Sequence, residues 1–89
     1  MKHMDLLAYQ EMMAGVTKDI HAACVGMEIS VMWDDGKARM ITGTHKVKLW
    51  NNLGDVEFHI EHEDLLAKGN AYKGFLILVE TRVKKALSV

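Results

Sequence analysis

The stretch Val56–His62 constrains the fold of this chain more than any other segment. Apolar side chains occupy every second position, Val56, Phe58 and Ile60, and polar or charged side chains fill the positions between them. Successive side chains of a β-strand point to opposite faces, so this alternation predicts a strand with one buried and one solvated face. The fold must therefore contain a sheet that is covered on one side.

An amphipathic helix is expected before this strand. Asp5 is a suitable N-cap, and Gly26 is a suitable C-terminal stop. Between them apolar residues recur at every third or fourth position, which is the repeat of a helix with one buried stripe: Leu6, Tyr9, Met13, Val16, Ile20 and Ala23. The stripe either packs on the sheet of its own chain or pairs with its copy in a homodimer.

Two further strands are predicted between the helix and Val56. Alternation from Met27 to Trp33 indicates the first, and the second runs from Ala38 to Trp50. Asp35-Gly36 predicts a type I′ hairpin turn between them, because both residues tolerate a positive φ. Residues 51–54 (Asn-Asn-Leu-Gly) predict a second turn, so the three strands form an antiparallel meander.

The second turn sets a register in which apolar residues face apolar residues and lysines face a carboxylate or a histidine. The predicted pairs are Trp50 with Asp55, Leu49 with Val56, Lys48 with Glu57, Val47 with Phe58, Lys46 with His59 and His45 with Ile60.

The first turn pairs Trp33 with Ala38 and Val31 with Met40, so the even-numbered residues of the second strand would face inward near Ala38. The second turn makes the odd-numbered residues face inward near Val47. One extra residue must then be absorbed, and we predict a β-bulge at Gly43. A three-residue first loop is the alternative.

The C-terminal part has two interpretations. Helical spacing with a Glu80–Lys84 pair favours a helix over residues 72–87, while the apolar run 75–79 also fits a fourth strand. With 89 residues we expect one domain, residues 1–89. The predicted class is α+β: an antiparallel meander sheet of three or four strands, packed against an N-terminal helix and a C-terminal helix.

Composition narrows the classes of partner. The formal net charge is −1, and Glu57 and Glu61 offset Lys46 and Lys48 in the predicted register, so no nucleic-acid partner is expected. No segment approaches the roughly 18 apolar residues of a membrane span. Cys24 is the single cysteine, which fits a reducing compartment, and we expect a cytoplasmic protein.

His45 and His62 are the candidate ligand-binding residues. The register places both on the core side of the sheet, as diagonal neighbours beside the predicted bulge. Trp33 and Trp50 are candidates for the apolar wall of a small-molecule pocket between sheet and helix.

No catalytic residue, cofactor or metal site is predicted. The chain lacks His-x-x-x-His and Cys-x-x-Cys spacing, and no third metal ligand accompanies His45 and His62. Cys24 flanks the apolar stripe, and Asp19 lies too far round the helix to orient His21, so we interpret Cys24 as a buried structural thiol.

The run from Thr44 to Leu49, continuing through Asn52-Leu53-Gly54 into Val56-Glu57-Phe58, resembles the C-terminal region of aspartate-dehydrogenase-type reductases. The nucleotide-binding half of that family, with its GxGxxG motif, has no counterpart in this sequence. The resemblance therefore implies neither an activity nor a site residue for this chain.

Three functions follow as hypotheses. The first is a small binding or interaction module with a small-ligand pocket near His45 and His62. The second is a homodimeric adaptor that binds a protein partner through the Met-rich first helix or a sheet edge. The third is a small enzyme or metal-binding protein that uses His45 and His62, which we rank last.

Overall fold

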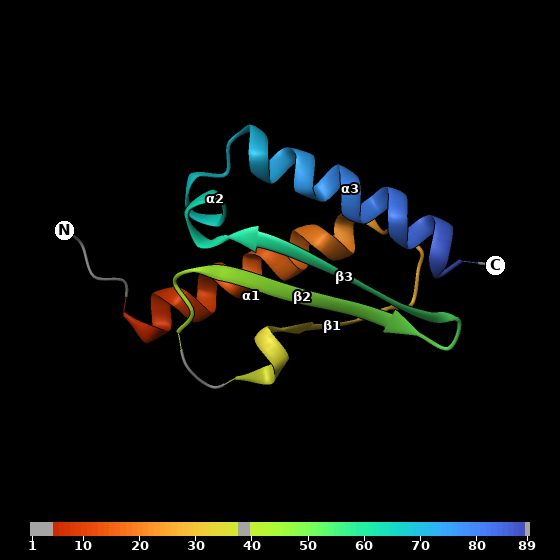
Figure 1. Ribbon diagram of the computed structural model, residues 1–89, viewed down its shortest axis with the longest axis horizontal. Helices are drawn as coiled ribbons and strands as arrows, with labels where there is room; N and C mark the ends of the chain where they lie inside the picture. The colour runs from red at the N-terminus through yellow and green to blue at the C-terminus, as the bar shows by residue number, and fades with distance from the viewer. Residues whose placement is uncertain (1–4, 38–39, 89) are drawn as a thin grey trace.

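The computed structural model describes residues 5–37 and 40–88. Over these residues a three-stranded antiparallel sheet packs against two long helices (Figure 1). The elements in chain order are α1 (Leu6–Ala23), β1 (Ser30–Trp33), a tight turn (Asp34–Gly36), β2 (Thr44–Asn51), β3 (Gly54–Glu61), α2 (His62–Ala67) and α3 (Asn70–Ala86). The predicted α+β class is confirmed. The C-terminal segment is a helix, so the fourth-strand alternative is wrong.

Helix α1 begins as the sequence predicts. The Asp5 carboxylate accepts a hydrogen bond from the amide of Ala8 at 2.7 Å, which satisfies one of the free amides of the first turn. Val16 and Ile20 are fully buried. Leu6 was expected in the buried stripe but is 51% exposed, because the first turn of α1 contributes nothing to the apolar cluster of the core.

The hairpin β2–β3 has the predicted register at every position that was named, from Trp50 opposite Asp55 to His45 opposite Ile60. Its inward residues are buried: Val47, Leu49, Phe58 and Ile60. Because the strand order is β1-β2-β3, β3 is an edge of the sheet.

The predicted first hairpin is wrong. Trp33 pairs with Val47 and Val31 pairs with Leu49, and β2 begins at Thr44, after Gly43, so there is no bulge at that glycine. Ala38, the partner expected for Trp33, lies outside the described residues.

Two features explain why the first hairpin differs from the prediction: the backbone conformation of residues 34–36, and the side of the sheet to which the residues of β1 point. Asp35 and Gly36 do adopt positive φ values of 58° and 74°, but so does Asp34 at 51°, and three such residues in succession do not form a two-residue hairpin turn. The observed register also places Val31 and Trp33 beside inward residues of β2, so no extra residue has to be absorbed.

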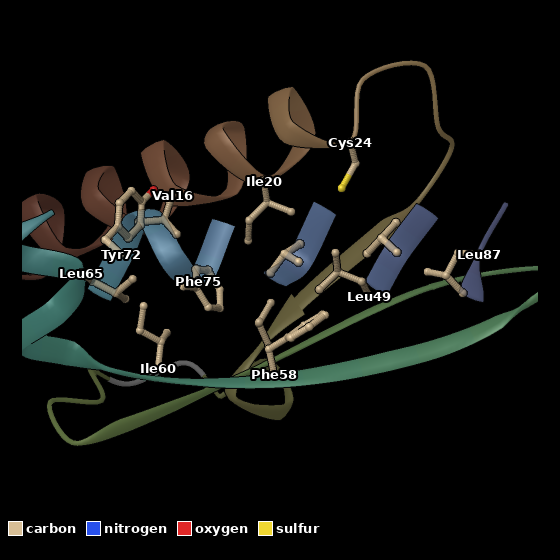
Figure 2. Packing of buried hydrophobic residues seen from close by; sticks show 13 residues of the cluster. Val16, Ile20, Cys24, Leu49, Phe58, Ile60, Leu65, Tyr72, Phe75 and Leu87 are labelled. Atoms are coloured by element: carbon tan, nitrogen blue, oxygen red, sulfur yellow. The ribbon is translucent and has the colours of Figure 1, made fainter. Parts of the chain in front are cut away.

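The core lies between the sheet and the two long helices, and α2 contributes Leu65 (Figure 2). Cys24 is 1% exposed in this cluster, and burial raises the pKa of its thiol, which fits the predicted structural role.

The Tyr72 hydroxyl of α3 donates to the Asp19 carboxylate of α1 at 2.5 Å. Burial and this hydrogen bond raise the pKa of Tyr72 well above its usual range. Over the described residues, no helix combines the length and the hydropathy needed to cross a membrane.

Candidate functional site

His45 and His62 lie in direct contact. His45 faces inward from the first part of β2, and His62 is the first residue of α2, where its amide donates to the carbonyl of Gly43 at 2.9 Å. His45 Nε2 and His62 Nδ1 are 2.9 Å apart, and the two residues are 0% and 6% exposed. The approach of the two rings follows from the β2–β3 register, although no bulge accompanies it. Their role in ligand binding stays a prediction.

Asp34 is a third member of this group, which we call the histidine network (Asp34, His45 and His62). Its Oδ2 lies 2.7 Å from His45 Nδ1, and its Oδ1 accepts the amide of Lys46 at 2.9 Å. This role of Asp34 was not predicted from the sequence. The available signal was the doubled aspartate, since an Asp-Gly turn needs only Asp35.

When both rings are neutral, their partners in the network determine which nitrogen of each ring carries the proton. The Asp34 carboxylate requires a proton on His45 Nδ1, which leaves His45 Nε2 to accept from the Nδ1–H of His62. His62 Nε2 is then the basic nitrogen, and no hydrogen-bond partner for it occurs among the described residues. Burial, and next the neighbouring His45, lower the pKa of His62, while Glu63 acts in the opposite direction.

Aromatic side chains enclose the network. The Tyr9 ring stacks on His62 with centroids 6.0 Å apart, and Trp33 approaches His45 edge-on at 5.9 Å. Trp33 is in turn fixed by a hydrogen bond from its indole nitrogen to the hydroxyl of Thr17 at 2.9 Å. Trp33 therefore lies against His45, as a wall of the predicted His45–His62 site.

Trp50 does not join this group. The inward residues of β2 are the odd ones, so Trp50 faces the other side of the sheet. There it lines an open hollow of about 410 Å³ together with Met32 and Lys48. The predicted set of four site residues is thus divided between the two faces of the sheet.

Four open hollows lie on the described part of the chain, and neither His45 nor His62 lines any of them. Every buried side-chain nitrogen and oxygen in the described part of the chain has a hydrogen-bond partner. No group of three or more His, Cys, Asp or Glu side chains within residues 5–37 and 40–88 is arranged to hold a metal ion. The hydrogen bonds of the network thus use every polar atom of its three side chains except His62 Nε2, and they join the 34–36 turn, β2 and α2.

An open groove lies between β3 and α3, and we call it the β3–α3 groove. Its volume is about 330 Å³. It is lined by Thr44, His59, Ile60, Glu61, Asp64, Ala71, Gly74, Phe75 and Leu78. Ala71 and Gly74 are exposed, and a Cβ added at Gly74 would meet nothing within 4 Å, so small residues leave space beside the strand.

Acidic residues dominate the edge of this groove. Glu61 and Asp64 line it, Glu57 lies further along β3, and no Lys or Arg of the described chain lines it. The two lysines of β2 are already paired, Lys46 with Asp35 at 2.6 Å and Lys48 with Asp55 at 3.4 Å. The groove was not predicted from the sequence, because it depends on how α3 lies beside β3. The spacing of Ala71, Gly74 and Leu78 along one helix face was the only signal of it.

Comparison with known protein families, with curated proteins and with solved structures finds no match to this chain. The resemblance to aspartate-dehydrogenase-type reductases is accordingly not supported by a matching family. The structure defines a class, an α+β protein with a three-stranded antiparallel sheet, and its function has to be argued from the site itself.

Proposed function

We propose that this protein is an interaction module that binds an extended segment of a partner protein in the β3–α3 groove. The observation that carries the proposal is the position of the groove along an open strand edge, with α3 as its second wall. The proposed class, a binding module, is the one expected from the sequence, but the proposed binding site is the groove and not the pair His45 and His62.

The backbone of β3 supplies the first contribution to binding. An edge strand presents unpaired N–H and C=O groups at every second residue, and an extended peptide satisfies them by adding one strand to the sheet. Such strand addition is a recurrent mode of peptide recognition, in which main-chain hydrogen bonds give affinity and neighbouring pockets select side chains.

The floor of the groove supplies the second contribution. Ile60 and Phe75 are 6% and 7% exposed at its base, and Leu78 is 47% exposed on its α3 wall. An apolar side chain of the bound segment would cover Leu78 and fill the space left by Ala71 and Gly74. Apolar burial of this kind contributes about 25 cal/mol for each Å² removed from water.

The small-ligand hypothesis at His45 and His62 has less support. Both residues are almost fully buried, and neither lines any of the four hollows. The homodimer expected from the sequence stays a prediction.

Selection from a phage-displayed library of random 12-residue peptides tests the proposal. The target is the wild-type protein, and each enriched peptide is measured against Ala71→Leu, which fills the groove, and Ala22→Leu, which adds the same side chain at an exposed site on α1. We expect enriched peptides to bind wild type and Ala22→Leu alike and to lose at least about tenfold in affinity for Ala71→Leu, a change of about 1.4 kcal/mol. Peptides that bind Ala71→Leu unchanged, or a selection without enrichment, would contradict the proposal.

A further inference from the structure

We infer that the segment bound in the β3–α3 groove is a cationic strand, with lysine or arginine at every second position and apolar residues between them. The inference rests on the proposed function and names its class of partner. It is carried by two observations: the charge along the outer side of β3, and the pattern of the strand that already pairs with β3.

The two faces of β3 demand different side chains from a neighbouring strand. On the outward face stand Glu57, His59 and Glu61, all exposed, while Phe58 and Ile60 face the core side toward α3. Residues directly opposite in an antiparallel pair share a face, and opposite charges there are stabilising. An added strand therefore matches β3 when its outward residues are basic and its inward residues are apolar.

The carboxylates on this edge are available to such a partner. Glu57 Oε2 is 3.6 Å from His59 Nε2, and Glu61 Oε1 accepts a hydrogen bond from the Thr44 hydroxyl at 2.7 Å. Among the described residues, neither of them nor Asp64 makes an ion pair with a lysine or arginine. A basic strand would supply the missing positive charge.

Strand β2 already shows the pattern that we infer. Its central residues read Lys-Val-Lys-Leu over 46–49, with Lys48 opposite Glu57 on the outward face and Val47 opposite Phe58 on the inward face. A second strand of this pattern on the free edge would repeat that complementarity. β2 itself cannot serve a second molecule, because it is paired on both sides, with β1 and β3.

A second copy of the chain fits the edge poorly. If two β3 strands pair antiparallel about His59, Glu57 of each faces Glu61 of the other, and if they pair about Phe58, Asp55 faces Glu61. Like charges directly opposite are destabilising, and charged edge strands are a common protection against self-association. The acidic edge thus disfavours self-pairing and favours a basic partner.

Fluorescence anisotropy with designed heptapeptides tests the inference. The probe is fluorescein-labelled acetyl-KVKLKVK-amide, and the comparison peptides replace lysine by glutamate (EVELEVE) or by serine (SVSLSVS). Two further probes carry N-methyl groups on the amides of either the lysine or the apolar positions. Only one of these sets faces β3 in a given pairing, so strand addition predicts that one N-methylated probe fails and the other still binds.

Matched variants localise the charge effect. Glu57→Gln with Glu61→Gln removes two charges at the groove, and Glu11→Gln with Glu28→Gln removes two exposed charges elsewhere. We expect the first pair to weaken binding of the lysine peptide about five- to tenfold and the second pair to leave it within about twofold. Added salt should also weaken binding of the lysine peptide, because it screens exposed charges.

The outcomes separate the two claims. If the serine or glutamate peptide binds as tightly as the lysine peptide and one N-methylated form fails, strand addition stands and the cationic partner is overturned. If no peptide binds, or if both N-methylated forms bind as well as the parent, strand addition is overturned and the inference falls with it.

Discussion

At the scale of single residues, Asp34 connects the 34–36 turn to β2 through one carboxylate. Both of its oxygens bind neighbouring residues of β2, Oδ1 the Lys46 amide and Oδ2 the His45 ring. His45 passes this contact on to His62 at the start of α2. Because His45 is fully buried, a missing partner would leave a polar group without water to replace it.

The Asp34→Asn substitution tests this role. An amide keeps one acceptor oxygen and tolerates the positive φ, but it cannot accept from both the Lys46 amide and the His45 ring as the carboxylate does. We expect the free energy of unfolding to fall by about 1–3 kcal/mol in urea denaturation. Asp35→Asn is the matched control, since Asp35 is exposed and its ion pair among the described residues is with Lys46 at the surface. Equal effects of the two substitutions would refute the role of Asp34.

The pH dependence of stability follows from His62. Its pKa in the folded protein is lowered below the ordinary value of 6.5, so the unfolded chain takes up the proton first. The stabilisation from neutral His62 is therefore complete above about pH 6.5 and decreases as the pH falls through the folded pKa.

An NMR titration of the His62 ring measures this shift directly. We expect a midpoint below 6.5, and a free energy of unfolding that falls less steeply with acidification in His62→Gln than in wild type. A midpoint at or above 6.5 would contradict the account of this residue.

At the scale of elements, the hairpin β2–β3 could be predicted from the sequence with its register, whereas the pairing of β1 could not. A short turn and strict alternation determine the register between Leu49 and Val56 with local information alone. The pairing of β1 depends instead on where the Asp34 carboxylate binds, ten or more residues away. The same β2–β3 register, set by the short turn, identified His45 and His62 as neighbours.

The groove could not be predicted in this way. Its walls come from two elements whose relative position follows from tertiary packing, such as the edge-to-face contact of Phe58 with Phe75. Trp50 shows the converse error, because its residue type suggested a pocket wall while its parity places it on the other face of the sheet.

Gly74 offers a prediction at the level of helix α3. It lies inside the helix, is exposed, and has open space where a Cβ would stand, so Gly74→Ala should stabilise the protein by about 0.5–1 kcal/mol. Gly54→Ala is the contrasting control: it should be destabilising, because Gly54 has a φ of +152°. Thermal unfolding checks both signs, and a loss of stability in Gly74→Ala would contradict a regular helical conformation with open space at this position.

At the scale of the whole molecule, the two long helices are joined where Tyr72 donates to Asp19. This bond crosses from α3 to α1 over the core, and it is partly buried. Together with the apolar cluster, it holds α3 in the position that forms the second wall of the groove.

Removal of one hydroxyl tests this junction. Tyr72→Phe keeps the ring in the core and should lower the free energy of unfolding by about 1–2 kcal/mol, as expected for a hydrogen bond to a carboxylate. Asp19→Asn keeps an acceptor oxygen and should lose less. Chemical denaturation of both variants decides the matter, and an unchanged Tyr72→Phe would show that the bond contributes nothing.

Hydrogen exchange at β3 tests the central claim most directly. Amide exchange of the protein is followed by NMR with and without the peptide acetyl-KVKLKVK-amide. We expect the peptide to slow exchange at alternating residues of β3, whose amides face the free edge, and to leave the β1 edge unchanged. Slowed exchange at β1 instead, or none at β3 under conditions where the peptide is bound, would contradict the proposal that β3 is the binding edge.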